Sequence, residues 1–342
     1  MATVVSITNP ITGAVEQVDK LDHTAQQIDD AVALAPQLSN PNLLDNWYFG
    51  NPVNQRGQTS YTGSGYMIDR WYADEVVLAI SSGAIRVSRS SVGQWYARIM
   101  QNLETELSKE IAGKTCTLSA LVKSVSGIGK VQLSLFNISD NASTTNIYAD
   151  LTGGIDLITV TFVVPESYSG RSLGVFFYPD VDDSHRSNGC DVYSVKLELG
   201  SQQTLAHQDA DGNWVLNEIP NYGEQLRRCQ RYFCRFNFGR NDLFFGSLTS
   251  NLDKAWITIP TPVVMRTAPS VSFSGTFNGV IRGNGFQLEF LTGNSTVAAD
   301  TSTTRCCNIL ITPNTKPSAW TAQQVVMIYT STEWYMDCSA DL

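Results

Sequence analysis

The sequence contains little charge and no long apolar run, and each shortage excludes a class of protein. Asp, Glu, Lys and Arg make up 16% of the 342 residues, and the net charge is −9. This balance does not favour nucleic-acid binding through a broad basic surface. The absence of a run of about 18 apolar residues argues against membrane insertion through a helix. Because the first residues also lack the regions of a signal peptide, we expect a soluble protein made in the cytoplasm.

The charge is unevenly distributed along the chain. Residues 1–234 hold 16 Lys and Arg against 25 Asp and Glu, whereas residues 235–342 hold 7 against 7. The neutral, aromatic-rich C-terminal third should therefore recognise partners by shape, stacking and hydrogen bonds rather than by long-range attraction.

Residues suited to catalysis are sparse. The three histidines, His23, His185 and His207, lie far apart and form neither a triad spacing nor an HExxH motif. The seven cysteines include no CxxC pair, so we expect reduced and mostly buried thiols. Neither residue type indicates an active site.

An acidic loop offers the remaining candidates for chemistry. Asp180, Asp182 and Asp183 could supply the paired carboxylates of a glycoside hydrolase. Asp191 shares its strand parity with Tyr193 and is predicted to face inward, where an unpaired carboxylate is costly. Either a structural Ca²⁺ ion or hydrogen-bond donors must satisfy it, and both interpretations stay open.

Apolar and polar residues alternate along most of the chain, which predicts a mainly β protein. Residues 41–200 are predicted to form a jelly-roll β-sandwich, and residues 236–342 a small all-β C-terminal tip domain. The predicted sandwich strands cover residues 84–89, 116–122, 131–136, 158–164, 173–178 and 191–200; those of the tip cover 254–260, 270–277, 286–291, 306–312 and 325–330.

Two short helices with apolar stripes are predicted outside the strands. Residues 1–40 are predicted to form an extended arm followed by a coiled-coil helix. Residues 201–235 are predicted to form a linker followed by a second helix. Helices this short are marginal alone, which favours association into a homotrimer, although packing on their own domains is the alternative. The predicted trimerisation residues are Val18, Leu21, Ala25, Ile28 and Val32 in the first stripe and Tyr222, Leu226, Cys229 and Phe233 in the second.

Aromatic residues are the strongest signal of a binding function. Trp–Tyr pairs begin at positions 47, 71 and 95, and adjacent strand residues face opposite sides, so each pair can bury one ring and expose the other. An exposed ring can stack on the apolar face of a sugar. Core packing is the alternative, and Trp71 is its clearest candidate. The candidate glycan-binding residues are Trp256, Trp320, Trp334, Tyr335, Tyr48 and Tyr72.

Four stretches in a fixed order carry a family resemblance. They are NLLDNWYFGNPVNQRG, GYMIDRWYAD, VYSVKLELGSQQTLA and YGEQLRRCQRYF. The set resembles phage and prophage tail-fibre proteins, in which a carbohydrate-binding-module-like jelly roll leads through a helix to a variable tip. The resemblance covers about residues 41–235. The His-x-His pair that places iron on the trimer axis of some such fibres is missing.

The resemblance implies a homotrimeric receptor-binding protein of a virion tail, assembled in the bacterial cytoplasm and acting at the host cell surface. Its N-terminal arm would dock to a tail or baseplate protein, and its tip would mediate host attachment by binding bacterial surface polysaccharide without enzymatic activity. One alternative is a glycan-degrading tailspike or a glycoside hydrolase with a binding module. Another is a structural baseplate or collar component.

Overall fold

A computed structural model describes most of the chain. It has two compact units, Met1–Ser39 and Asn40–Leu342. The described residues are 4–8, 15–19, 39–90, 97–125, 130–179, 189–249, 253–275, 278–283, 286–290, 295–315 and 324–341.

The first unit contains a β-hairpin where an arm and the start of a helix were predicted. Strands β1 (Val4–Thr8) and β2 (Val15–Asp19) pair antiparallel, with Val18 opposite Val5. The helical prediction is therefore wrong at Val18, because β-branched residues on both segments favour strand pairing. The other residues of the first stripe, Leu21, Ala25, Ile28 and Val32, lie outside the described residues.

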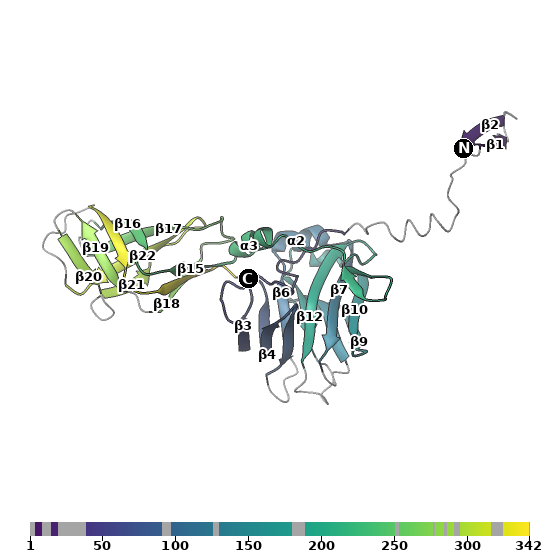
Figure 1. Cartoon of the computed structure of the whole chain (residues 1–342), viewed down its shortest axis with the longest axis horizontal. Helices are drawn as coiled ribbons and strands as arrows, with labels where there is room; N and C mark the ends of the chain where they lie inside the picture. The colour runs from purple at the N-terminus through teal and green to yellow at the C-terminus, as the bar shows by residue number, and fades with distance from the viewer. Residues whose placement is uncertain are drawn as a thin grey trace. The chain divides into compact units, whose positions relative to one another are not determined.

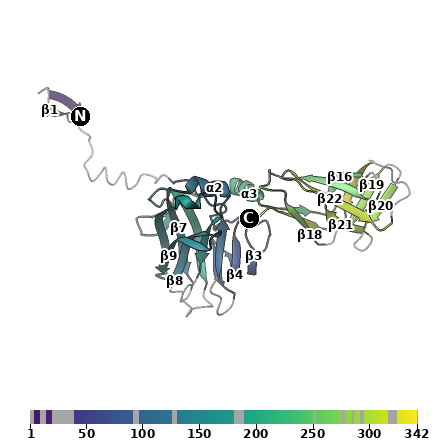
Figure 2. The same ribbon diagram turned by 180° about the vertical axis from the view of Figure 1, so that it is seen from behind.

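The second unit begins with a sandwich made from one ten-stranded sheet that folds over on itself (Figure 1). The strand order is β10-β7-β12-β5-β4-β6-β11-β8-β9, with β3 also paired to β4. Figure 2 shows β8 and β9 from the opposite side. The strands are β3 (Ser60–Tyr66), β4 (Tyr72–Ser81), β5 (Ala84–Arg89), β6 (Arg98–Asn102), β7 (Thr115–Ser124), β8 (Lys130–Asn137), β9 (Ala142–Asp150), β10 (Ile155–Val163), β11 (Leu173–Tyr178) and β12 (Cys190–Leu199).

Strand β4 joins the two layers of the sandwich. Residues 72–74 pair with β6, and residues 76–81 pair with β5. Between them Glu75 has a φ of 53°, a left-handed conformation that an extended strand does not contain. The chain therefore turns at Glu75, and the apolar inner faces of both layers share one core. The prediction of a mainly β chain with sandwich-like sheets is confirmed.

The NWYF segment, residues 46–49, packs against β12 without forming a regular strand. The amide of Phe49 donates to the carbonyl of Tyr193, and the amide of Val195 donates to the carbonyl of Trp47. Trp47 is 2% exposed and Phe49 is fully buried. These two rings anchor the entry of the chain in the core, as their apolar size predicts.

Two α-helices occur among the described residues. Helix α2 (Thr105–Ile111) lies within the sandwich sequence and was not predicted, whereas α3 (Tyr222–Gln230) confirms the second predicted helix. The side chain of Asn221 caps α3 by accepting from the amide of Glu224. A short hairpin, β13 (Ala206–Gln208) with β14 (Trp214–Leu216), occupies part of the predicted linker.

The C-terminal strands form two sheets around a second core. The orders are β15-β24-β18 and β20-β19-β23-β16-β17-β22-β21. The last strand therefore pairs with the first one after α3, which returns the C-terminal residues to that end of the domain. The strands are β15 (Phe233–Phe238), β16 (Leu243–Leu248), β17 (Ala255–Pro260), β18 (Ser270–Gly275), β19 (Gly279–Gly283), β20 (Phe286–Phe290), β21 (Ser295–Ala299), β22 (Cys306–Pro313), β23 (Val325–Thr330) and β24 (Trp334–Ser339).

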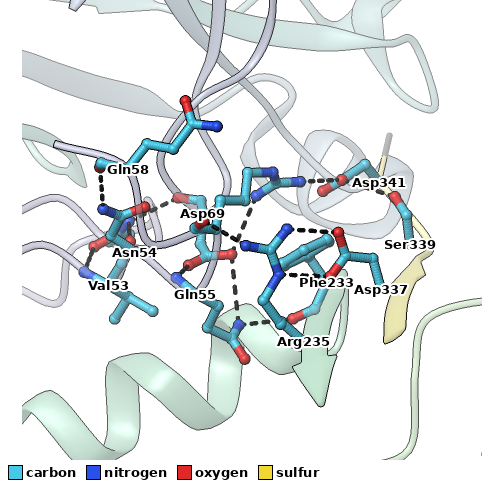
Figure 3. Close-up of polar contacts among 12 residues, drawn as sticks. Val53, Asn54, Gln55, Gln58, Asp69, Phe233, Arg235, Asp337, Ser339 and Asp341 are labelled. Carbon is cyan, nitrogen blue, oxygen red and sulfur yellow. Dashed lines mark hydrogen bonds and ion pairs between the residues drawn. The ribbon is translucent and has the colours of Figure 1, made fainter. Parts of the chain in front are cut away.

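A buried polar cluster ties the sandwich to this C-terminal domain (Figure 3). Arg56 pairs with Asp69 at 3.2 Å and with Asp341 at 2.8 Å. Its guanidinium lies 3.8 Å from the centre of the Phe233 ring. Gln55 donates to the carbonyl of Phe233 at 2.8 Å. We call Arg56, Asp69 and Asp341 the Arg56 clasp.

Most of the cysteines are buried, as predicted. All seven are free, and all but Cys306 are buried. As for membrane insertion, the described part of the chain holds no helix with the length and apolarity needed to cross a bilayer.

Candidate functional site

The C-terminal domain exposes a group of large apolar side chains on one face of its seven-stranded sheet. Strand β16 alternates between exposed Leu243 and Phe245 and more buried neighbours, and β17 and β23 show the same period of two. We call the exposed set the outer apolar face. It consists of Leu243, Phe245, Trp256, Val325 and Met327, which are 43%, 63%, 40%, 68% and 37% exposed.

Strand pairing places these side chains next to one another. In β16, Phe245 lies opposite Met327 of β23. Ser247 lies opposite Val325 on one side and opposite Trp256 of β17 on the other. Because directly paired residues of antiparallel strands share a face, the aromatic and aliphatic groups form one continuous surface.

A groove of about 440 Å³ crosses this surface between β16 and β17. It is lined by Phe245, Gly246, Ser247, Trp256 and Thr258. A Cβ atom added to Gly246 would come within 2.5 Å of the carbonyl oxygen of Trp256, so only glycine allows the two strands to approach this closely. The close approach holds the Trp256 and Phe245 rings on adjacent strands.

The chemistry of the groove is aromatic and neutral. None of its five lining residues carries an ionisable group. Ser247 and Thr258 contribute hydroxyls, and that of Thr258 donates to the amide oxygen of Asn308 at 2.9 Å. Aromatic faces can stack on the C–H faces of a sugar, while hydroxyls exchange hydrogen bonds with its hydroxyl groups. An anionic or cationic ligand would find no partner charge among these residues. The groove therefore suits a neutral polyhydroxylated ligand.

Of the predicted glycan-binding aromatics in this domain, Trp256 lies in the groove and Trp334 does not. Trp334 is 1% exposed and stacks on Phe238 with ring centres 4.1 Å apart. Its glycan-binding assignment is corrected to a core role, because β24 turns Trp334 inward and leaves Tyr335 outward. Tyr335 is 39% exposed, with the Arg235 guanidinium 5.6 Å from its ring centre.

In the two described Trp–Tyr pairs of the sandwich, the tryptophan is buried and the tyrosine is partly exposed, as predicted. Trp71 is fully buried, which confirms its core role, and its neighbour Tyr72 is partly exposed. Tyr72 packs edge to face on Tyr66 at 5.4 Å. Tyr48, beside buried Trp47, is also partly exposed and lines a separate small pocket. The structure does not bring Tyr48 or Tyr72 to the outer apolar face, since both belong to the other domain.

Of the four residues in the second predicted trimerisation stripe, two are buried and two are exposed enough to contact a partner subunit. Cys229 is fully buried and Phe233 is 3% exposed, both within their own chain. Their assignment to a subunit interface is corrected, because Cys229 of α3 and Phe233, which begins β15 rather than continuing the helix, are both buried within their own chain. Tyr222 is 44% exposed and Leu226 is partly exposed.

Asp191 does not point into the core as predicted. A β-bulge between Val192 and Ser194 shifts the register of β12 and reverses the parity used for that prediction. The carboxylate instead pairs with the Arg86 guanidinium through bonds of 2.9 and 3.1 Å. This ion pair supplies the positive charge expected from Ca²⁺, and the hydrogen bonds with Asp191 raise the pKa of Arg86.

Replacing Asp191 by asparagine should therefore have little effect. The Arg86 side chain is 46% exposed, and exposed ion pairs contribute about 0–1 kcal/mol. We expect a loss of less than about 1 kcal/mol in the free energy of unfolding by urea titration, equal with and without Ca²⁺. A larger loss that appears only when Ca²⁺ is present would restore the metal interpretation.

Several predicted residues lie outside the described part of the chain: Trp95, Tyr96, Trp320, Asp180, Asp182, Asp183, His23 and His185. Among the residues that are described, no group of three or more His, Cys, Asp or Glu side chains could hold a metal ion. His207 is exposed and lies 2.5 Å from the amide oxygen of Asn217 in the β13–β14 region. It contacts no candidate site.

Sequence reasoning missed most of the outer apolar face. Phe245, Val325 and Met327 were not selected, although Val325 and Met327 fall on a predicted strand. The detectable signal was the run of five apolar residues that begins VVMIYT, which leaves an apolar side chain on both faces of the strand.

Comparisons with known proteins give only weak similarities. No protein-family model and no curated protein matches the chain. Similar solved structures include a CBM4 carbohydrate-binding module, with 14% identity over 46% of this chain and 99% of that one and a TM-score of 0.33. A CBM22-1 xylan-binding domain from Paenibacillus barcinonensis shows 12% identity over 47% and 96%, with a TM-score of 0.30.

A third similar structure is the enzymatically active domain of tailspike protein 4 of Bacteriophage CBA120. It shows 14% identity over 46% of this chain and 21% of that chain, with a TM-score of 0.30. At such TM-scores the similarities carry no argument about function.

Proposed function

We propose that this chain is a non-catalytic adhesion protein whose C-terminal domain binds a neutral polysaccharide on a bacterial surface. The observation that carries the proposal is the groove of the outer apolar face, where Trp256 and Phe245 lie beside Ser247 and Thr258. Exposed apolar patches of this kind mark interaction sites in soluble proteins.

The shape of the groove supports a polymer end or chain segment as the ligand. The groove is wide and open to solvent, so a chain segment can lie along it without being enclosed. The absence of ionisable lining residues favours binding by stacking and hydrogen bonds, which gives a low affinity for each site. Several weak sites on one particle can together raise the overall affinity by about 10²–10⁴-fold.

Such multivalency fits a homotrimeric receptor-binding protein of a phage or phage-derived tail. We propose that residues 1–40 attach the protein to a tail or baseplate protein and that the C-terminal domain contacts the host. The resemblance of residues 41–235 to tail-fibre proteins and the neutral composition of residues 235–342 support this assignment. Catalysis is not part of the proposal, so purified protein should release no reducing ends from surface polysaccharide.

Alanine substitutions in the groove test the adhesion proposal. Trp256→Ala and Phe245→Ala should each lower the adsorption of purified protein to host cells by about tenfold or more, because each removes a stacking surface. Tyr148→Ala is the matched control, since Tyr148 is 56% exposed on the sandwich and should be neutral. Unchanged adsorption of the Trp256→Ala/Phe245→Ala double variant, with its melting temperature preserved, would refute the assignment.

Burial of the same face between subunits is the second candidate. Val325 is 68% exposed and Leu243 is 43% exposed, and aliphatic groups of this size contribute little to stacking on sugars. Apolar surface without charge is typical of subunit interfaces. If the face mediates assembly, Val325→Asp should convert the oligomer to monomer in sedimentation-velocity experiments; if it binds glycan, the oligomeric state should not change.

A further inference from the structure

A small pocket lies between the NWYF loop and the start of α3, apart from the groove of the C-terminal domain. It is lined by two tyrosines, three side-chain amides and two apolar residues. These are Tyr48, Tyr222, Asn46, Asn51, Gln225, Ile219 and Pro220. We propose that this pocket binds the acetamido group of an N-acetylated amino sugar.

Gln225 provides the central observation. It is 7% exposed, and its Oε1 atom accepts a hydrogen bond from the backbone amide of Asn46 at 2.7 Å. Because that amide can only donate, the orientation of the Gln225 side chain is fixed with Oε1 toward Asn46. Its Nε2 group has no hydrogen-bond partner within the described structure, although the residue lines the pocket. A donor that opens onto a pocket and has no protein partner favours a ligand that brings an acceptor.

The tyrosines form apolar walls with polar ends. The ring of Tyr48 lies directly over Gly50, since a Cβ atom added there would be 2.3 Å from Cζ and from the hydroxyl oxygen of that ring. Tyr222 begins α3 and is 44% exposed. Ile219 is 71% exposed and lies with Pro220 on the lining of the pocket.

The size of the pocket limits what can enter it. Its volume is about 50 Å³, several times the roughly 10–15 Å³ that an enclosed site needs to hold one water molecule. It therefore admits a substituent of a few heavy atoms and not a whole sugar ring. An exposed rim that includes Ile219 leaves space for the ring outside.

An acetamido group matches each of these features. Its carbonyl oxygen can accept from Nε2 of Gln225, its methyl group can pack between the tyrosine rings, and its N–H can donate to a phenol oxygen or to Asn51. A carboxylate substituent fits less well because none of the lining residues is cationic. A hydroxymethyl group would fill less of the apolar wall. The pocket therefore selects for N-acetylation rather than for a particular sugar ring.

Titration of the full-length protein with free sugars tests the proposal. N-acetylglucosamine should bind in isothermal titration calorimetry or shift protein NMR signals of the pocket, whereas glucosamine and glucose should bind at least about tenfold more weakly. Equal binding of all three sugars, or no binding of N-acetylglucosamine at concentrations up to tens of millimolar, would overturn it.

Two variants separate the pocket from the rest of the surface. Gln225→Glu keeps an acceptor for the Asn46 amide but removes the free donor, and Tyr222→Ala removes one wall. Each should weaken N-acetylglucosamine binding by about tenfold, and Tyr148→Ala should not change it. If Gln225→Glu fails to fold, Tyr222→Ala alone decides the outcome, since that side chain is partly exposed. Unchanged binding by folded Tyr222→Ala contradicts the proposal. The loss caused by Tyr222→Ala should be the same in the parent and in the Trp256→Ala background, so failure of the adhesion proposal would leave this result intact.

Discussion

Replacing Arg56 by methionine should lower the free energy of unfolding by roughly 3–5 kcal/mol at pH 8. The side chain of Arg56 is 13% exposed, and its partners Asp69 and Asp341 are 0% and 8% exposed. Methionine preserves much of the side-chain volume but leaves two buried carboxylates without their shared cation. Removing one partner of a buried ion pair is costly because the remaining charge has lost its water as well.

The loss should be smaller at pH 5 than at pH 8. Burial raises the pKa of Asp69 to about 7, although Arg56 acts in the opposite direction. Since the folded state holds this proton more tightly than the unfolded state, the Asp69 contribution to stability falls as the pH rises from about 4 to 7. Without Arg56 the pKa of Asp69 should rise further, so ionisation at pH 8 would destabilise the variant more than the parent.

Urea titrations at pH 5, 6.5 and 8 measure both effects. Arg171→Met is the matched control, because Arg171 and its partner Asp140 are 47% and 44% exposed and should lose less than about 1 kcal/mol at every pH. Asp69→Asn should remove the component of the pH dependence that comes from Asp69. An Arg56→Met cost that is below 1 kcal/mol, or equal at pH 5 and pH 8, would show that the clasp does not join the two domains energetically.

Trp334→Ala should destabilise the protein by about 3–5 kcal/mol, whereas Trp256→Ala should change the free energy of unfolding by less than about 1 kcal/mol. Both tryptophans belong to strands of the same domain. Trp334 is 1% exposed and stacks on Phe238 in the core, while Trp256 is 40% exposed in the groove. Deleting the buried ring creates a cavity, and deleting the exposed ring does not.

Denaturant unfolding of the two variants, combined with cell adsorption, separates stability from recognition. Trp256→Ala should lose adsorption at near-parental stability, and Trp334→Ala should lose stability. Comparable destabilisation by the two substitutions would mean that Trp256 is also a core residue and that the groove is not an open binding surface.

The alternating strands were predictable because their signal is local. Residues 116–122 and 306–312 follow a period of two, and the structure has β7 and β22 there. Strand β3, with the sequence SYTGSGY, was not predicted because Gly63 and Gly65 lower strand propensity. Its hydrogen bonds with β4 hold it in the extended conformation instead. In the sequence alone neither glycine indicates a strand, and only the pairing with β4 shows that this segment is one.

Contacts between residues that lie far apart in the sequence could not be predicted. Arg56 and Asp341 are separated by 285 residues, and Asn46 and Gln225 by 179. No local pattern links such residues, so the clasp and the acetamido pocket emerge only from the fold. The error at Asp191 has a similar origin, because a single bulge in β12 reverses the parity of everything before it.

Oxidation of Trp256 by a tryptophan-specific reagent, followed by peptide mass spectrometry, tests most directly whether the outer apolar face is the recognition surface. Trp256 should be oxidised readily in the free protein and protected when isolated host polysaccharide is added, while buried Trp334 stays unreactive in both states. Equal oxidation of Trp256 with and without bound polysaccharide would contradict the account, because the ligand would then be bound elsewhere.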